Sequence, residues 1–355
     1  MRLLLALALA LAVPGAASAS TVSVVLADGC QGDAACSKYG GAPPVPITSF
    51  LGGPGEANRV TLARDGGEFV VRDDGAPLRA EAPCRAVDEH TVRCPVTEGG
   101  YGLHGIGAGL GDGDDVLSIA GDLGVETSIS GGEGADVIEG GPGNDEIDGG
   151  AGGDRLLGGG GFDELSYSTR TAPVVVDLAR GTGGEAGEDD AVGGFETLVG
   201  GSGDDVLRGA AAAETIDGGL GDDVLRGRGG DDALFGGEGA DRLGGQAGDD
   251  RLFGDPGQGD DYYTPIIRLR ADRLEGGAGD DELSDTGGAN TYLGGPGRDV
   301  LEGGAGPDRM DAGSGADRVR AAGGGRDRVR CGSGLDRARL DGRDRARGCE
   351  RVTRR

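Results

Sequence analysis

Aspartate returns every nine residues over much of this chain, and this spacing limits the possible folds more than any other feature. Asp136, Asp145, Asp154 and Asp163 lie nine apart, each in the frame Gly-Gly-x-Gly-x-Asp-x-apolar-x. The first three copies read GGEGADVIE, GGPGNDEID and GGAGGDRLL. An apolar residue follows two places after each aspartate, beginning in this block with Ile138. A disordered chain has no reason to keep that period, so the spacing predicts a folded repeat.

The frame appears once early, at residues 110–118, and returns in two later blocks. Two segments, residues 167–191 and 254–271, interrupt it as insertions. With 80 glycines, 3% aromatic residues and no Trp, the 355 residues cannot build an ordinary globular core, so stacking of the repeats must replace it. The aspartates at the sixth position of the nonapeptide are Asp115, Asp136, Asp145, Asp154, Asp163, Asp205, Asp223, Asp232, Asp241, Asp250, Asp281, Asp299, Asp308 and Asp317.

Each position of the nonapeptide has a structural task. The three residues around the apolar position are long enough for one short strand, with the apolar side chain turned inward. Glycines at positions 1, 2 and 4 let the preceding six residues reverse the chain. Two nonapeptides then make a coil of 18 residues with a strand on each side. Coils stacked at the strand spacing of about 4.8 Å predict an all-β parallel β-roll.

This stacking places aspartates that are 18 apart in sequence above one another. At about 5 Å two carboxylates repel by about 1 kcal/mol in water, and by about 3 to 4 kcal/mol at an effective dielectric of 20. A divalent cation between them would reverse that sign. The turns offer carboxylates and backbone carbonyls, which suit the six- to eight-fold coordination of calcium better than the tight octahedron of magnesium. We therefore predict several bound calcium ions, with the sixth-position aspartates as ligands.

In these motifs the chain resembles the hemolysin-type calcium-binding repeat (RTX) family over roughly residues 110–336. The resemblance implies that each ion is shared between the turn of repeat n and that of repeat n+2. Glu196, Glu214 and Asn290 stand at the sixth position in three repeats, and pairs that use them stay open. We expect extra aspartates at position 5, such as Asp222, to raise the negative potential rather than bind ions. The pairs with aspartate at both places are Asp136/Asp154, Asp145/Asp163, Asp205/Asp223, Asp223/Asp241, Asp232/Asp250, Asp281/Asp299 and Asp299/Asp317.

The parts of the chain before and after the repeats differ in texture. Residues 1–19 read as a secretory signal peptide, with Arg2, an apolar stretch and an Ala-Ser-Ala cleavage site, so we expect a secreted, extracellular protein. Residues 20–108 predict a small β-rich domain, because Val- and Thr-rich runs are separated by Gly, Pro and Asp turns. We assign residues 109–339 to the β-roll and residues 340–355 to a basic C-terminal cap.

Six cysteines in an exported chain favour disulfides over a zinc site, since no CxxC occurs and there are only two histidines. Fifteen connectivities are possible, and proximity in sequence favours local pairs. The expected bridges are Cys30–Cys36, Cys84–Cys94 and Cys331–Cys349.

The net charge of −28 excludes nucleic acid as a partner and favours cations. Residues 309–355 differ, with 14 Arg against 7 acids, a local charge of +7. This basic end is interpreted either as a charge-balancing cap or as a site for an anionic surface. We expect no membrane span, and a cell-surface or polysaccharide partner remains open.

The sequence contains no motif that indicates enzymatic activity. It has no HExxH, no GxSxG and no P-loop, and two histidines leave little room for a triad. We therefore predict a calcium-binding repeat protein with a structural or adhesive role outside the cell. The alternatives are an extracellular enzyme acting on polysaccharide, and an adhesin whose Tyr262/Tyr263 insertion binds a partner.

Overall fold

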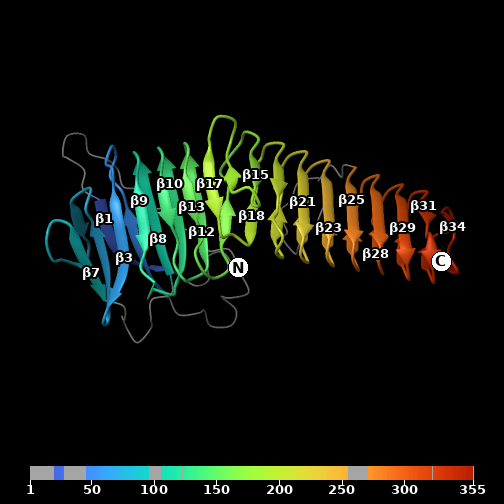
Figure 1. Ribbon diagram of the computed structural model, residues 1–355, viewed down its shortest axis with the longest axis horizontal. Helices are drawn as coiled ribbons and strands as arrows, with labels where there is room; N and C mark the ends of the chain where they lie inside the picture. Colours follow the sequence, from blue (N-terminus) through green and yellow to red (C-terminus); the bar gives the residue numbers. More distant parts are fainter. Residues whose placement is uncertain are drawn as a thin grey trace. The chain divides into compact units, whose positions relative to one another are not determined.

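The computed structural model describes residues 20–27, 45–95, 105–121, 123–254, 271–321 and 323–354. Every element in this part of the chain is a β-strand, which confirms the predicted all-β class. The chain divides into two compact units, Met1–Leu165 with Glu188–Phe195, and Ser166–Gly187 with Glu196–Arg355. Figure 1 labels several strands of each unit.

The first unit begins with an antiparallel sheet. Strand β4 (Glu68–Asp73) lies between β3 (Arg59–Asp65) and β7 (Thr91–Pro95) and pairs antiparallel with both. Alternate side chains point inward, and the core includes Leu62, Phe69, Val71 and Val92, each 0–1% exposed. A disulfide joins Cys84, directly before β6 (Arg85–Ala86), to Cys94 in β7. The other strands here are β1 (Ser20–Ala27), β2 (Val45–Leu51) and β5 (Leu78–Ala80).

Parallel coils continue this first unit. Strand β2 pairs parallel with β8, and β3 pairs parallel with β9, so the antiparallel strands form the base onto which the coils add. In each coil the apolar residue faces its equivalent 18 residues on, as Ile129 faces Ile147 and Ile138 faces Leu156. One row is β8 (Gly105–Asp112), β10 (Glu126–Glu133), β12 (Asp145–Ala151) and β14 (Glu164–Ser166), and the other is β9 (Val116–Ile119), β11 (Val137–Glu139), β13 (Arg155–Leu157) and β17 (Asp190–Gly193).

The second unit consists of two rows of parallel strands, one on each side of its coils (Figure 1). The first row is β18 (Thr197–Val199), β20 (Thr215–Asp217), β22 (Ala233–Phe235), β24 (Arg251–Phe253), β26 (Glu282–Ser284), β28 (Val300–Gly303), β30 (Arg318–Ala321), β33 (Arg337–Leu340) and β35 (Arg351–Arg354). The second is β15 (Val175–Asp177), β19 (Val206–Arg208), β21 (Val224–Gly229), β23 (Arg242–Ala247), β25 (Arg273–Ala278), β27 (Thr291–Pro296), β29 (Arg309–Gly315), β31 (Arg328–Arg330) and β34 (Arg345–Arg347). Two short strands, β16 (Thr182–Gly183) and β32 (Ser333–Gly334), pair with β15 and β29.

A thin apolar core runs along these coils. Leu207, Leu225 and Leu243 occupy the eighth position of alternate repeats, one in each successive coil, and are 0–2% exposed. Burying each such side chain contributes roughly 1.5 to 3 kcal/mol. Each nonapeptide buries about one of them, which confirms the predicted inward column and shows how little apolar contact each coil has.

The two expected insertions have different outcomes. Residues 167–191 are not a continuous interruption, because Val176 of β15 faces Leu207 and Val192 of β17 faces Leu156 in coil register. Residues 255–270 lie outside the described part of the chain. On either side of them the coils resume in register, with Leu243 facing Leu274 across 31 residues instead of 18.

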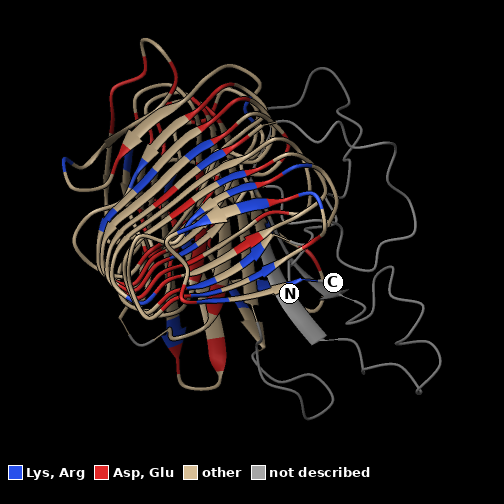
Figure 2. Ribbon diagram, turned by 90° about the vertical axis from the view of Figure 1, so that its right-hand side faces the viewer, with Lys and Arg blue, Asp and Glu red and all other residues tan. Residues whose placement is uncertain are grey.

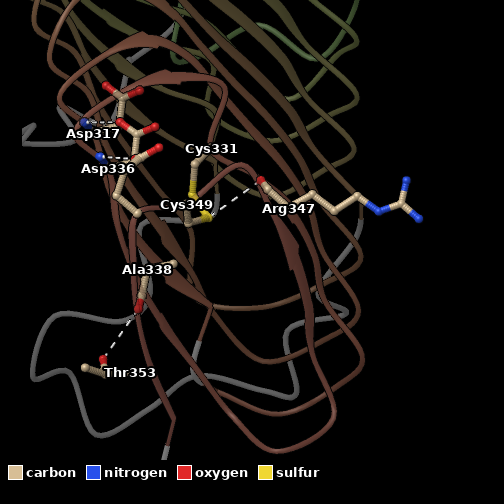
Figure 3. The surroundings of a disulfide bond; sticks show 8 residues. Asp317, Cys331, Asp336, Ala338, Arg347, Cys349 and Thr353 are labelled. Carbon is tan, nitrogen blue, oxygen red and sulfur yellow. Dashed lines mark hydrogen bonds between the residues drawn. A yellow bond between two sulfur atoms is a disulfide. The ribbon is translucent and has the colours of Figure 1, made fainter.

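Parallel pairing continues to β35, where Arg337 faces Arg351. The C-terminal coils are joined by a disulfide between Cys331 and Cys349, which lies beside Asp317 and Asp336 (Figure 3). The expected Cys30–Cys36 bridge and the signal peptide at residues 1–19 lie outside the described residues. The proposed domain boundaries stay predictions.

Candidate metal centre

The sixth-position aspartates are buried and arranged in columns along the coils. In each case the backbone N–H of one aspartate donates to Oδ1 of the aspartate one coil further on. All seven aspartate pairs predicted from the sequence lie in adjacent coils with this hydrogen bond, at 2.7 to 3.0 Å. The bond fixes each carboxylate against the preceding coil and leaves its second oxygen to face the turn.

That second oxygen lies over the first glycine of its own repeat. A Cβ built on Gly218 would lie 2.5 Å from both Asp223 Oδ2 and the carbonyl oxygen of Gly236. Any side chain at Gly218 would overlap both atoms, so this turn has no room for a residue other than glycine. The arrangement brings a carboxylate oxygen and a backbone carbonyl of the next coil to the same place, which is the kind of oxygen set that calcium takes.

Most of these second oxygens are buried and receive no hydrogen bond from the described part of the chain. Leaving a buried charged oxygen unsatisfied is costly unless a proton or a cation neutralises it. A column of such oxygens therefore fits a bound cation. The aspartates of the columns with an unsatisfied Oδ2 are Asp115, Asp136, Asp223, Asp232, Asp250, Asp272, Asp281, Asp299, Asp308, Asp317, Asp327 and Asp336.

Burial raises the pKa of the carboxyls of Asp136 and Asp223, and neighbouring carboxylates raise it further. The pKa of Asp136 rises to about 7 and that of Asp223 to about 8, against an ordinary value of 3.8. In both cases burial is the larger cause, and the hydrogen bond from the preceding aspartate N–H opposes it. The folded coils thus resist carrying these charges alone, and a bound calcium ion would supply the missing positive charge.

Glycines at positions 2 and 4 keep the turns close together. Gly219 and Gly221 have φ values of 93° and 124°, which L side chains rarely adopt. A Cβ on either residue would also overlap the carbonyl oxygen of Gly201 or Gly203 in the coil before. Within the described residues no three His, Cys, Asp or Glu side chains gather to hold a metal. An ion here would therefore be held by carboxylates of two coils together with backbone carbonyls.

The position-5 aspartates have a role that sequence reasoning missed. Asp204 Oδ1 accepts a hydrogen bond from the N–H of Asp222, and Asp222 Oδ1 accepts one from Ala240 N–H, at 2.9 and 3.1 Å. These bonds run in the opposite direction to those of position 6. They join successive turns at the surface, so these aspartates stabilise the stack as well as adding charge.

The columns also contain residues that the glycine-based frame did not identify as ligands. Each keeps Asp-x-apolar without the full run of glycines, and that shorter pattern could have identified it. Glu214 and Asn290 also lie in the columns, where their backbone N–H groups donate to Asp232 and Asp308. The additional column aspartates are Asp190, Asp272, Asp327, Asp336 and Asp344.

One turn carries an arginine where the frame has glycine. Arg228 stands at position 2 of its repeat with a φ of 83°. Its guanidinium donates to both carboxylate oxygens of Asp177 and to the carbonyl of Gly209, all at 2.8 Å. The equivalent turn of the preceding coil, residues 209–214, has alanines in place of the second and fourth glycines and Glu214 in place of aspartate. The guanidinium also holds the pKa of Asp177 below its usual range.

Coils that bury one carboxylate per nonapeptide beside backbone carbonyls define an ion-binding parallel β-roll. A model of the RTX calcium-binding nonapeptide repeat matches residues 130–165, 190–225, 226–262, 269–301, 284–319 and 293–329. The repeats of this chain belong to that family and bind calcium ions. A search of curated proteins found no match. No helix in the described ranges has the length and apolarity to cross a membrane.

Proposed function

We propose that this protein is an exported structural or adhesive protein whose repeats fold when they meet calcium outside the cell. The observation that carries the proposal is the column of buried carboxylates. Each coil adds negative charge to its interior while adding only one or two apolar side chains. Such a fold depends on its ions in a way that an ordinary apolar core does not.

The energetic balance supports this dependence. One buried Leu, Ile or Val per nonapeptide contributes roughly 1.5 to 3 kcal/mol. Ordering nine residues costs roughly 1 to 2 kcal/mol per residue in backbone entropy alone. Backbone pairing offsets part of that cost, and repulsion between carboxylates adds to it. Ion binding is linked to folding and supplies the remaining term.

Export is supported by the expected signal peptide and by two disulfides in the described residues, Cys84–Cys94 and Cys331–Cys349. Disulfides persist in oxidising surroundings outside the cytosol. Extracellular calcium modules commonly bind at about 10⁻⁴ to 10⁻³ M. Low calcium before export would keep the repeats extended, and calcium outside would fold them.

A calcium titration of the purified mature chain tests the proposal. Far-ultraviolet circular dichroism and hydrodynamic radius should change together as calcium rises, and a chelator should reverse both. A chain equally compact and β-rich in excess chelator would refute calcium-driven folding. Export is checked separately by mass spectrometry of the culture medium, where the mature protein should begin at Ser20.

A specific observation favours adhesion through the C-terminal coils. Arg309, Arg328 and Arg345 face one another in register along one sheet and are exposed. Arg318, Arg337 and Arg351 form a second such row in the other sheet. Figure 2 shows arginines on the strands of successive coils and acidic residues at the bends. Strands about 4.8 Å apart place these guanidinium groups in a closely spaced line, which suits an extended acidic polysaccharide.

Neutralising one row tests this second function in saturating calcium. Replacing Arg309, Arg328 and Arg345 with Gln should weaken binding to dextran sulfate at least tenfold. It should also reduce the salt dependence of binding, because three guanidinium groups no longer pair with sulfate groups. A matched control replaces Arg226, Arg242 and Arg251, exposed arginines outside these rows, with Gln. Equal binding by the two variants, or equal binding of uncharged dextran, would contradict adhesion through the row.

A further inference from the structure

One repeat places its carboxylate at an unexpected position. Residues 285–293 read DTGGANTYL, with Asp285 at position 1, where other repeats have glycine, and Asn290 at position 6, where they have aspartate. The repeat has lost a carboxylate at one place and gained one at another. Asn290 keeps the hydrogen bond of the column, because its Oδ1 accepts the N–H of Asp272 at 2.8 Å.

The side chain of Asn290 does not replace the lost charge. Its Nδ2 donates to the carbonyl oxygen of Gly287 at 2.7 Å, so an N–H group occupies the direction that the second carboxylate oxygen takes elsewhere. The side chain of Asn290 is 1% exposed and neutral. The pair formed by the coils of Asp272 and Asn290 would thus have one sixth-position carboxylate instead of two.

Asp285 reaches into that pair from position 1. It is 8% exposed, and its Oδ1 accepts the N–H of Gly287 at 2.8 Å. Its Oδ2 lies beside Asp272 Oδ2, since a Cβ built on Gly254 would overlap both oxygens. In an ordinary coil such as that of Gly218, the carbonyl oxygen of the next coil holds this place. Here a charged oxygen replaces a neutral one.

An independent observation shows that this place needs a cation or a proton. Asp272 is 3% exposed, and its Oδ2 is buried and receives no N–H from the described part of the chain. Two carboxylate oxygens facing each other in a buried site repel strongly unless a positive charge lies with them. The same neutralisation problem exists in every aspartate column, and calcium solves it there.

We propose that Asp285 is a calcium ligand, and that it restores to this pair of coils the carboxylate lost at Asn290. This inference rests on the calcium binding of the repeats and extends it to a position outside the sixth-position frame. The site then holds its ion with Asp272 of one coil and Asp285 of the next, together with backbone carbonyls. The number of ions bound by the second unit does not fall at Asn290.

Moving the carboxylate back tests the proposal. D285G restores the usual glycine and should lower the number of bound calcium ions by one, measured on the full chain by equilibrium dialysis and metal analysis. The double variant D285G/N290D rebuilds the ordinary repeat GTGGADTYL and should regain that ion. D285N, a neutral side chain of the same size, should also lose one ion and guards against an effect of shape.

The control variant is E302Q, which removes an exposed carboxylate that pairs with Arg320 and should leave the ion count unchanged. Circular dichroism at saturating calcium checks that all variants fold. An unchanged ion count in both D285G and D285N would overturn the proposal and indicate a shared proton instead. Failure of the wild-type chain to bind calcium would refute the function of the repeats as a whole, a result distinct from this one.

Discussion

The antiparallel sheet of residues 59–95 and the nonapeptide coils are both built from short strands, yet they bury different things. In the sheet, alternate residues form an apolar core that contains Phe69 and Val92. It buries one carboxylate, Asp73, whose Oδ1 accepts the N–H groups of Arg59, Gly75 and Ala76 at 2.8 to 3.2 Å and whose Oδ2 is unsatisfied. The coils bury one apolar side chain and one carboxylate per repeat, and leave Oδ2 of most carboxylates unsatisfied.

This difference separates two ways to stabilise β-structure. The sheet gains its stability from apolar contact, hydrogen bonds and the Cys84–Cys94 disulfide, none of which needs an ion. The coils place charge in their interior, which on our proposal links their folding to calcium. One chain therefore contains a part that should fold at any calcium concentration and a part that should not.

Calcium removal should have the largest effect and should separate the two regions. In chelator we expect amide hydrogen exchange to become fast across residues 131–354 and to stay slow in strands β3, β4 and β7, because only the coils depend on ions. Hydrogen exchange with mass spectrometry on the full chain measures both regions at once. Uniform loss of protection, or protection of the coils in chelator, would break the comparison.

Acid should partly replace calcium in the coils. The folded pKa of Asp136 and Asp281 is about 7 and that of Asp223 about 8, all above the ordinary value of 3.8, with burial as the main cause. Raised folded values add stability that is fully present below about pH 4 and lost as pH rises through 6 to 8. Calcium-free protein should therefore gain β-structure when the pH falls from 8 to 5.

When calcium is present, the effect of pH on β-structure should reverse, and lowering the pH should reduce it. Protons then compete with the ion for the same oxygens. Circular dichroism of metal-free protein at each pH, with and without added calcium, measures both arms. Equal β-content at pH 5 and pH 8 without calcium would contradict the assigned cost of the buried carboxylates. Amide protection in the antiparallel sheet serves as the internal reference.

Neighbouring aspartates should behave differently within the coils. Asp223 is fully buried and lies between Asp205 and Asp241 in the column, whereas Asp222 only joins turns at the surface. Asp223→Asn should lower the calcium stoichiometry by one or two ions, and Asp222→Asn should weaken affinity through lost charge without changing the count. Isothermal titration on the full chain gives both quantities. Equal loss of ions in the two variants would refute the difference in roles.

The period of nine residues is enough to predict most of the fold. It gives the strand positions, the inward column at Ile138 and its equivalents, and the 18-residue pairing, because each follows from backbone geometry and burial. It also gives the seven aspartate pairs. Their assignment as calcium ligands is our proposal.

The remaining residues of the candidate site could not be predicted from the nonapeptide frame, because that frame requires glycines that their turns lack. Asp190 and Asp272 lie in the columns although their turns lack the full run of glycines. The exchange of roles between Asp285 and Asn290 depends on which atoms converge at Gly254, which is a property of three dimensions. The partner of Arg228, Asp177, is 51 residues away, so no local pattern links them.

The smallest expected effect concerns Arg228. Its guanidinium donates hydrogen bonds to the carboxylate of Asp177, so here a coil carboxylate is bound by a donor of the chain itself, as Asp73 is in the antiparallel sheet. The side chain of Asp177 is 5% exposed and that of Arg228 is 29% exposed, so removing the arginine leaves a nearly buried carboxylate with the N–H of Arg180 at 3.1 Å and its exposed guanidinium at 3.6 Å. We expect Arg228→Gly to lower the free energy of unfolding by up to about 3 kcal/mol. Arg228→Ala should cost about 1 kcal/mol more, because alanine keeps the strain of a left-handed φ that glycine relieves.

Gln246 provides the control, since it faces Arg228 one coil further on and has a φ of 82°. Gln246→Gly should stabilise the coils by about 1 kcal/mol, because it relieves the same strain without breaking an ion pair. Urea unfolding at saturating calcium compares the variants. If Arg228→Gly were as stable as the wild type, the ion pair would contribute nothing, and every carboxylate of the coils would depend on calcium alone. A loss of stability would instead show that the chain can serve a coil carboxylate itself, as it serves Asp73 in the antiparallel sheet.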